Sequence, residues 1–399
     1  MSKEIFVTGT GIISALGVNK DETLAALRQQ RTGIAPLRYL KTSHTEFPVG
    51  EVKRTNEEMM AMLRIPQTEI ATRTSLMGML AVREALEEAG LRNKNNLRIA
   101  FINGTTVGGM DMSEQFYLDF LENDTKNAYI ASHDCGSCTE MIADYFGVFS
   151  MVETISTACS SAANAVMIGA MLINEGQADI AVVGGSECIT KFHLNGFNTL
   201  MILDNEQCKP FDANRAGLNL GEGAAYLVLE SDETIRKRNA QPVCSLSGCA
   251  NTCDAFHQTA SSPDGEGAYL AMKNALDAAR LLPDDIDYVN THGTGTPNND
   301  VSEGVAIDRV FQNRKPCISS TKSFTGHTTS AAGGVESVIS ILALKHNFIP
   351  VNLNFSSKME ELSFTPATNE TPSTPLKHVL CNSFGFGGND SALIFSKTE

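Results

Sequence analysis

The sequence lacks the features that would place a protein in a membrane or on nucleic acid. No uninterrupted apolar run approaches the roughly 20 residues that span a bilayer. The start of the chain has no basic segment followed by an apolar stretch, so we expect no secretion signal. Positive charge is scarce, because 31 Lys and Arg stand against 46 Asp and Glu for a net charge of −15. Such a charge disfavours nucleic acid and anionic membranes as partners and fits a cytoplasmic protein.

Cysteine is also sparse for a chain of this length. Ten cysteines among 399 residues are too few for a disulfide scaffold, and a reducing compartment fits them better. Cys135 and Cys138 have a C-x-x-C spacing with His133 just before them. No second pair lies at zinc-finger distance, so simple packing is favoured over a metal or redox role.

A glycine-rich stretch near the start invites comparison with a dinucleotide-binding loop. Gly9, Gly11 and Gly17 follow an opening apolar run, but the third glycine is misplaced for the fingerprint. An acidic residue about 20 positions further on is not obvious either. An NAD-dependent enzyme is therefore a remote alternative, and a tight turn after the first strand is the favoured interpretation.

Two parts of the chain read alike in the same order, which predicts an internal duplication. In each part an amphipathic helix leads to an apolar strand and a Gly/Thr turn, and a small-residue helix start follows later. Strands that alternate with helices indicate an α/β fold with mostly parallel sheets covered on both faces. A polar, Pro-containing stretch at 238–243 divides the chain into residues 1–240 and 241–399. The repeated segments are 81–91, 98–106 and 161–166, then 271–281, 286–294 and 330–335.

Cys159 is the first candidate for chemistry. It follows a short β-like run, and the apolar spacing after it predicts a helix that begins near Ser160. The positive end of the helix dipole favours a thiolate at this place, and a thiolate attacks acyl carbonyls. By itself, a cysteine among small residues is more often buried packing.

Three further segments strengthen the assignment of Cys159. In the first, residues 290–297, His292 leaves a strand end into a Gly/Thr turn, although a lone histidine in a turn is more often structural. The second, residues 320–327, carries Lys322 and His327, and Glu336 follows on the next helix. The third, residues 382–389, has glycines that permit close backbone approach. At the carboxyl ends of strands from both halves, Cys159 and His292 could share one site.

Together these segments resemble the β-ketoacyl-[acyl carrier protein] synthases of the thiolase superfamily, the elongating condensing enzymes of fatty acid and polyketide assembly. The resemblance runs over nearly the whole chain, from residues 7–11 to residues 382–388. It implies a thiolase-like five-layered αβαβα fold built from two duplicated halves. It also implies a homodimer with no organic cofactor of its own, because phosphopantetheine is carried by the partner acyl carrier protein.

The resemblance implies a decarboxylative Claisen condensation of malonyl-carrier with a Cys159-bound acyl chain, in fatty acid elongation. His292 and His327 would polarise the thioester oxygen, and Lys322 would tune the electrostatics near His327. The backbone N–H groups of Cys159 and Phe386 would form the oxyanion hole. Two-histidine centres separate elongating synthases from thiolases and from initiating synthases.

The remaining implied roles concern binding and support. Glu336 would hold Lys322 or a structural monovalent cation, and that candidate cation would lie near Asn290, Glu336 and Asn382; no firmer metal site is implied. The residues expected to bind substrate are Thr294 and Thr296 for the phosphopantetheine arm, Phe384 and Phe386 as a gate over the acyl pocket, and Val107 as the limit of that pocket.

Several departures from the family pattern bear on substrate range. Asn389 and Asp390 replace the usual Thr-Asn after the last glycines, and residues 328–330 replace a common Leu-Gly pair. Only Arg64 and Arg73 remain where relatives carry several basic residues that grip the acidic carrier. A specialised ketosynthase of a polyketide or aryl polyene pathway is therefore an alternative. A second is a non-catalytic partner subunit of a heterodimeric ketosynthase, although Cys159 argues against it. Acyl chain length and the carrier's identity stay open.

Overall fold

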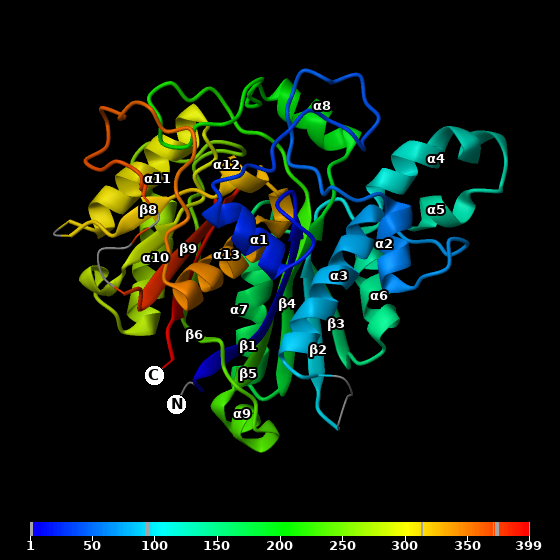
Figure 1. Ribbon diagram of the computed structural model, residues 1–399, viewed down its shortest axis with the longest axis horizontal. Coiled ribbons are helices and arrows are strands. Elements are labelled where there is room, and N and C mark those ends of the chain that lie inside the picture. The colour runs from blue at the N-terminus through cyan, green and yellow to red at the C-terminus, as the bar shows by residue number, and fades with distance from the viewer. Residues whose placement is uncertain (1–2, 92–95, 313, 370, 372–374, 399) are drawn as a thin grey trace.

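The structure is a computed structural model, and it describes every residue except 1–2, 92–95, 313, 370, 372–374 and 399. Strands run through the middle of the molecule and helices cover them (Figure 1). The elements of the first half are β1 (Ile5–Ser14), α1 (Lys20–Arg28), α2 (Asn56–Leu63), α3 (Arg73–Glu88), β2 (Ile99–Gly104), α4 (Met110–Glu122), α5 (Asn127–Ala131), α6 (Cys135–Phe146), β3 (Met151–Ile155), α7 (Ser161–Asn174), β4 (Ile180–Glu187), α8 (Lys191–Thr199), β5 (Gly223–Ser231) and α9 (Asp232–Arg238).

The second half of the chain continues with a shorter series of elements. They are β6 (Cys244–Cys253), α10 (Glu266–Ala279), the 3-10 helix η1 (Pro283–Asp285), β7 (Tyr288–Asn290), α11 (Pro297–Val310), β8 (Cys317–Ser319), α12 (Lys322–Thr325), the 3-10 helix η2 (Thr329–Ala331), α13 (Ala332–His346), β9 (His378–Gly385) and β10 (Asn389–Ser396).

The strand order repeats itself. The described strands join in the order β3-β2-β4-β5-β1-β6-β10-β9-β7-β8. Read outward from the junction between β1 and β6, the first group runs β1-β5-β4-β2-β3 and the second runs β6-β10-β9-β7-β8. The number of each strand in the second group is therefore that of its counterpart in the first group plus five. The two groups join only through Phe6 opposite Ser245 and Val7 opposite Cys244. The duplication predicted from the sequence is thus present in the topology. The division into residues 1–240 and 241–399 stays a prediction.

The expectation of mostly parallel sheets is wrong. β2 is parallel to β3 and β4, and β7 is parallel to β8 and β9. The pairs β1–β5, β4–β5, β6–β10, β9–β10 and β1–β6 are all antiparallel. The apolar runs in the sequence, on which this expectation rested, indicate only that both faces of each strand are buried. Burial on two faces does not fix the direction of the neighbouring strand.

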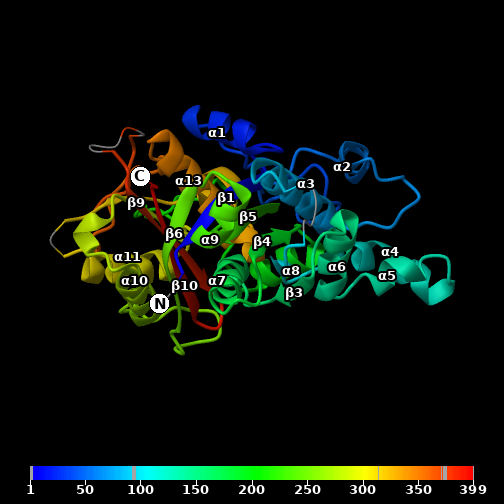
Figure 2. The same cartoon turned by 90° about the horizontal axis from the view of Figure 1, so that it is seen from below.

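Three hydrophobic clusters separate the layers. One contains α7, α13 and the inner faces of both strand groups. A second packs α3 and α6 on the outer face of the first group, and a third packs α10 and α11 on the outer face of the second. Figure 2 shows these helix layers from a second direction. The order helix, sheet, helix, sheet, helix confirms the five-layered αβαβα fold.

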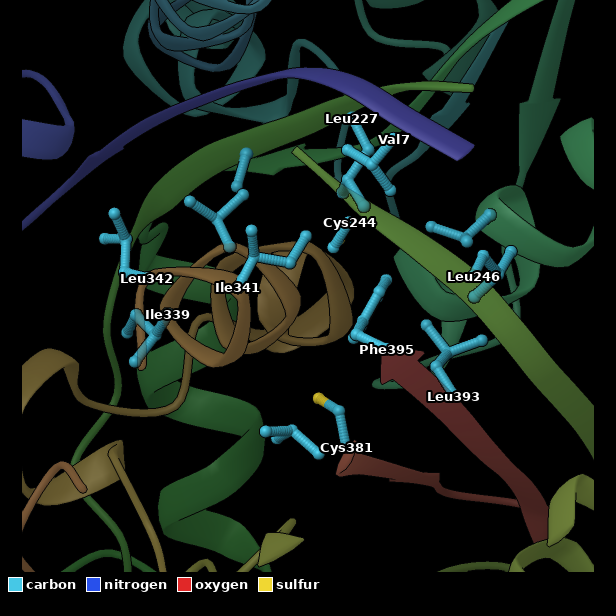
Figure 3. Close-up of a cluster of buried hydrophobic side chains, with 14 of the residues drawn as sticks. Val7, Leu227, Cys244, Leu246, Ile339, Ile341, Leu342, Cys381, Leu393 and Phe395 are labelled. Atoms are coloured by element: carbon cyan, nitrogen blue, oxygen red, sulfur yellow. The ribbon is translucent and has the colours of Figure 1, made fainter. Parts of the chain in front are cut away.

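The middle layer joins the halves. Figure 3 shows α13 side chains among those of strands from both groups. Ile339 and Ile341 of α13 lie in one cluster with Leu227 of β5, in the first half, and Phe395 of β10, in the second. All four side chains are almost fully buried. Burial of this kind contributes about 25 cal/mol per Å² of apolar surface, so the halves stabilise each other.

The glycine-rich stretch near the start forms a strand that ends in a tight turn, as we favoured, and not a dinucleotide-binding loop. β1 runs through it without a break from Ile5 to Ser14. A Cβ atom at Gly9 would lie 2.2 Å from the Ala85 carbonyl oxygen, and one at Gly11 would lie 2.0 Å from that of Ala81. The missing side chains let α3 approach β1 closely. The turn we favoured follows at the end of β1, where the Ser14 N–H donates to the Gly17 carbonyl at 2.9 Å and the Gly17 N–H donates to the Ser14 carbonyl at 3.2 Å.

None of the helices in the described part of the chain is both long and apolar enough to cross a membrane.

Candidate active site

Cys159 lies in a sharp turn between β3 and α7, which we call the Cys159 turn (residues 157–161). Ala158 has a φ of +52°, in the left-handed region that a residue with a side chain rarely adopts. Ser161 Oγ accepts from the Thr157 N–H at 2.9 Å and donates to the Ala158 carbonyl at 2.7 Å. These bonds hold the strained backbone. Ser160 is the N-cap of α7, as the sequence predicted.

The Cys159 thiol is buried and neutral at rest. Its Sγ lies 2.9 Å from His327 Nε2. Burial raises the pKa of the thiol to about 12, although the Lys322 charge and the Phe386 backbone N–H both act to lower it. The expectation that the helix dipole produces a resting thiolate is therefore wrong, because desolvation outweighs the dipole. The thiol must lose its proton as it attacks.

His292 follows the end of β7 and is held through its backbone. Glu303 of α11 accepts from the His292 N–H at 2.9 Å and from the Gly293 N–H at 2.7 Å. The His292 Nδ1 atom lies 3.3 Å from Lys322 Nζ. Burial lowers the pKa of His292 well below its usual value, and the charges of Lys322 and His327 lower it further. The imidazole is therefore neutral.

His327 follows α12, and hydrogen bonds hold both its backbone N–H and its backbone carbonyl. Its N–H donates to the Asn219 carbonyl at 2.7 Å, and its carbonyl accepts from the Gly221 N–H at 2.9 Å. Burial and then the Lys322 charge lower the pKa of His327 well below its usual value. The two imidazole rings are 5.2 Å apart and nearly perpendicular, at 86°.

The three reactive atoms converge. Cys159 Sγ and one ring nitrogen each of His292 and His327 all lie within 4.8 Å of one another, and all three residues are buried. A sulfur and two imidazoles at this spacing would also suit a zinc ion. Two halves of the chain supply the parts of this single centre.

Lys322 and Glu336 form an ion pair behind the histidines. Their side chains are 1 % and 2 % exposed, and Lys322 Nζ also donates to the His292 carbonyl at 2.6 Å. Burial raises the pKa of Glu336, and the charge of Lys322 opposes that rise. A paired ammonium at this place keeps both imidazoles neutral.

The hairpin between β9 and β10, which we call the Phe386 turn (residues 385–389), reaches the nucleophile. The Phe386 backbone N–H acts on the Cys159 sulfur and lowers the pKa of the thiol, and Ser383 Oγ donates to the Cys159 carbonyl at 3.0 Å. Asn389 Oδ1 accepts from Ser160 Oγ at 2.6 Å and from Asn164 Nδ2 at 2.8 Å. Asn389, noted as a departure from the family pattern, thus ties the Phe386 turn to the Cys159 turn.

A cavity of about 340 Å³ opens onto the centre. The Thr294 and Thr296 hydroxyls, 2.8 Å apart, line it. The Phe386 ring stacks on Phe197 with centroids 5.8 Å apart, and the Phe384 ring lies 5.9 Å from that of His292. The expected site residues that line the cavity are Cys159, His292, His327, Thr294, Thr296, Phe384 and Phe386.

The structure does not bring Val107 to this cavity. Val107 is 1 % exposed and belongs to the outer cluster with α3 and α6. Its backbone N–H points at Glu187, 3.4 Å away. The role of Val107 as the limit of an acyl pocket stays a prediction.

The expected cation position has suitable oxygens. Asn290 and Asn382 are fully buried, and so nearly is Glu336. Glu336 Oε2 and Asn382 Oδ1 have no hydrogen-bond partner among the described residues. A hard monovalent cation fits these two buried oxygens, because it would give each of them the partner that it lacks. The cation stays a prediction.

The C-x-x-C pair lies on α6 and carries no sign of reactivity. Burial raises the pKa of Cys135 to about 11 and that of Cys138 further. Within the part of the chain that the structure describes, the metal-type clusters contain neither residue.

Arg73 is not available to grip a carrier. Its side chain is 11 % exposed and donates through Nε to Glu222 Oε2 at 2.9 Å and through Nη2 to the Val52 carbonyl at 3.0 Å. Arg64, at the end of α2, is exposed. Of the two basic residues expected in carrier docking, only Arg64 is free to serve.

Sequence reasoning missed three residues that hold the site: Glu303, Ser383 and Ala158. Each acts through contacts with segments far along the chain, or through its backbone conformation. The one signal was the place of Glu303 on a helix that begins just after the His292 turn.

A five-layered fold whose two halves each bring part of a Cys-His-His centre to one cavity defines the condensing acyltransferases. Residues 2–234 match the family model described as β-ketoacyl synthase, N-terminal domain, and residues 243–356 match the corresponding C-terminal domain. The chain belongs to the β-ketoacyl synthase family, and it is a β-ketoacyl-[acyl carrier protein] synthase-type transferase.

Similar proteins divide between two groups. The 3-oxoacyl-[acyl-carrier-protein] synthase 2 of Coxiella burnetii is 32 % identical, over 99 % of this chain and 99 % of that protein. The structure of the ishigamide ketosynthase/chain length factor is 28 % identical over the whole of both chains, with a TM-score of 0.91. The ketosynthase ApeO in complex with its chain length factor ApeC, from Xenorhabdus doucetiae, is 30 % identical over 99 % of this chain and 98 % of that chain, with a TM-score of 0.86.

Proposed function

We propose that this β-ketoacyl synthase elongates fatty acyl chains on an acyl carrier protein. It would condense malonyl-carrier with an acyl group bound to Cys159, release CO₂ and form 3-oxoacyl-carrier. The observation that carries the proposal is the convergence of Cys159, His292 and His327 within 4.8 Å, all buried. Such a centre has a nucleophile for acyl transfer and two neutral N–H donors for an enolate.

In the first half of the reaction, Cys159 takes the acyl group. Its sulfur attacks the thioester carbonyl of acyl-carrier while the thiol proton moves to the phosphopantetheine sulfur. His327 Nε2, 2.9 Å from the Cys159 sulfur, thereby keeps its N–H for the second half of the reaction. The backbone N–H groups of Cys159 and Phe386 stabilise the oxyanion. The tetrahedral intermediate then expels phosphopantetheine as a thiol, which carries the proton that Cys159 gave up.

In the second half, malonyl-carrier replaces the first carrier. Its C–CO₂ bond breaks, CO₂ leaves, and the electron pair forms an enolate whose oxygen accepts hydrogen bonds from His292 and His327. The enolate carbon attacks the Cys159 thioester carbonyl and forms the new carbon–carbon bond. The carbon–sulfur bond then breaks, and the Cys159 thiolate takes a proton from water to return to the resting thiol. Neutral imidazoles suit this step because it needs polarisation with little net proton transfer.

Lys322 supports the histidines without touching the substrate. Its ammonium lies 3.3 Å from His292 Nδ1 and donates to the His292 carbonyl. Its charge disfavours an imidazolium at either histidine. The role proposed for Lys322 is therefore to keep both N–H donors neutral across the working pH range, with Glu336 holding Lys322 in place.

Substrate groups would enter along the 340 Å³ cavity. Thr294 and Thr296, whose hydroxyls face each other there, would bind the phosphopantetheine arm. Phe386, stacked on Phe197, would move aside with Phe384 once the acyl chain is loaded.

A second candidate function is specialised condensation in a polyketide or aryl polyene pathway. Two structural relatives, with TM-scores of 0.91 and 0.86, are described as a ketosynthase/chain length factor and a ketosynthase in complex with its chain length factor. This chain has the complete set Cys159, His292, His327 and Lys322, which supports a catalytic role rather than that of a non-catalytic partner subunit.

A homodimer is the proposed assembly. β3 is the outermost strand of its half-sheet, and an edge strand offers unpaired backbone groups to a second chain. On α4, which stands out at one end of the molecule (Figure 1), Tyr117, Leu118 and Leu121 are 54 %, 75 % and 62 % exposed. An apolar surface of this kind is typical of an interface. Sedimentation velocity of the purified chain would distinguish a dimer from a monomer that awaits a different subunit.

Reconstitution tests the proposal. The purified chain is incubated with malonyl-carrier and acyl-carriers of graded length, and mass spectrometry follows the products. Formation of 3-oxoacyl-carriers from saturated chains by the chain alone supports fatty acid elongation. Products only in the presence of a chain length factor, or only from unsaturated or oxygenated chains, support the second candidate. No decarboxylation under any condition contradicts both.

A further inference from the structure

Asp390 is a buried carboxyl that the proposed reaction does not use. It is the second residue of β10, just after the Phe386 turn, and is 4 % exposed. The Asn251 side chain donates to its backbone carbonyl, but no described residue donates a hydrogen bond to its carboxyl oxygens. Burial without a donor disfavours the ionised form of this carboxyl.

The side chain of Asp254 lies close to that of Asp390 beside Gly267 of α10. A Cβ atom at Gly267 would lie 2.3 Å from Asp390 Oδ2 and 2.7 Å from Asp254 Cβ, so the two Asp side chains come together over this glycine. The Asp254 carboxylate accepts from the Ser262 N–H at 2.7 Å and from Ser262 Oγ at 2.7 Å. Asp254 thus has its own donors, and Asp390 faces it with none.

Two segments close one wall of the cavity: Asp254 is the first residue of one, and Asp390 directly follows the other. We call residues 254–262 the cleft loop, because Thr259 and two of its neighbours line the cavity. The Asp254 N–H donates to the Gly388 carbonyl at 2.8 Å, and the Gly387 N–H donates to the Gln258 carbonyl at 2.8 Å. The cleft loop and the Phe386 turn are therefore fastened together directly beside the Asp254–Asp390 contact.

The charges that act on Asp390 are both negative. They are those of Asp254 and of Glu303 on α11, and together with burial they raise the pKa of Asp390 to about 8. The other titratable groups of the adjoining elements, Cys253, His257 and Glu266, are not among the groups that act on it. Around neutral pH, Asp390 is therefore a carboxylic acid.

We propose that Asp390 is a positioning residue, whose neutral carboxyl lets the cleft loop and the Phe386 turn pack together and so keeps the Phe386 N–H on the Cys159 sulfur. When Asp390 ionises, two carboxylates repel each other at the base of the turn. The turn then moves away from the cleft loop, and the oxyanion hole loses the Phe386 donor. The activity part of this inference rests on the proposed function.

Asp390→Asn tests the inference, because an amide has almost the same shape and does not ionise. Condensation is measured from about pH 6 to about pH 10, and the ratio of mutant to wild-type rate is followed. The ratio should be constant below pH 8 and rise about tenfold per pH unit above it. Asp264→Asn, an exposed aspartate close by in the sequence, should keep the wild-type profile. A ratio that does not change with pH overturns the proposal.

An infrared titration gives a second readout that does not depend on the reaction. The difference spectrum between wild type and Asp390→Asn should contain a protonated-carboxyl band that disappears with a midpoint near pH 8. A midpoint near the ordinary value of about 4 contradicts the proposal. If Asp390→Asn does not fold, Asp390→Ser gives the same comparison with a neutral side chain. Failure of the condensation assay at every pH would count against the proposed function alone, since the infrared result would still decide the state of Asp390.

Discussion

The two halves of this molecule have the same strand order but divide the chemistry between them. In the first half, residues 156–160 connect β3 to α7, and this short connection forms the strained turn that presents Cys159. In the second half, the matching connection between β8 and α13 covers residues 320–331 and carries Lys322 and His327. The comparison teaches that the functional difference between the copies lies in their connections.

A second pair of connections shows the same division. After β2, Thr105 Oγ1 donates to the buried carboxylate of Glu187 at 2.6 Å. After β7, the His292 and Gly293 N–H groups donate to the buried carboxylate of Glu303. In each half this loop therefore donates hydrogen bonds to a buried carboxylate, but only the loop of the second half carries a histidine of the active site. The strands set the frame and the loops supply the reactive groups.

The largest expected effect comes from the first half. Cys159→Ala should lower condensation by about 10⁴-fold or more, because no other group in the cavity can form the acyl thioester. Cys159→Gln should also stop condensation yet retain or raise malonyl decarboxylation, since both histidines remain. Mass spectrometry of the products separates the two reactions. Condensation by either variant would remove Cys159 from its role.

The second half should show the opposite pattern. His292→Ala and His327→Ala should each lower decarboxylation by about 10²- to 10⁴-fold, because each removes an N–H donor to the enolate oxygen. Acylation of Cys159 should suffer less in His292→Ala than in His327→Ala, as only His327 contacts the sulfur. Release of CO₂ and single-turnover acylation measure the two steps. Decarboxylation by His292→Ala at the wild-type rate would contradict the role of His292.

The ion pair behind the histidines should also contribute to stability. Glu336→Gln leaves the buried Lys322 charge uncompensated and should lower the free energy of unfolding by about 3–5 kcal/mol. Lys322→Met should cost a similar amount, because it leaves the Glu336 carboxyl without its partner. The double variant should recover much of the loss. Chemical denaturation of the three variants checks this, and additive losses in the double variant would show that the pair is not coupled.

Glu303 should make stability depend on pH. Burial raises its pKa to about 7, above the ordinary carboxyl value of about 4.3. The folded state therefore binds the proton more tightly, and this stability is fully present below about pH 4 and is lost as the pH rises through 7. The loss amounts to about 4 kcal/mol. Glu303→Gln should flatten this change in denaturation experiments, whereas Glu361→Gln, at an exposed position, should not. Equal slopes in the two variants would contradict the assignment.

The smallest expected effect concerns carrier docking. Arg64→Glu should raise the KM for malonyl-carrier by about 2- to 10-fold, with kcat unchanged and the difference shrinking at high salt, as for an exposed charge at an interface. Steady-state kinetics at two salt concentrations measure this. An unchanged KM at low salt would show that the carrier protein docks elsewhere. Neither half of the molecule would then have an assigned docking surface for the carrier.

The sequence by itself determined the family, the duplicated α/β fold and the identity of the central residues. Cys159, His292, Lys322 and His327 each lie in a short motif whose local pattern, a strand followed by a turn, is written in adjacent residues. The helix start near Ser160 followed from apolar spacing in the same way. Signals of this kind need no knowledge of what packs against them.

Only the tertiary structure decided strand direction, ionisation and access. It made five of the strand pairings antiparallel, raised the pKa of Cys159 by burial, and enclosed Arg73 against Glu222. It also made Gly9 a point of close contact with α3. In each case the property depends on atoms contributed by segments distant along the chain, and burial and charge sum over all of them. The sequence determines which chemical groups are present, and the fold determines the solvent exposure and the electrostatic environment of each one.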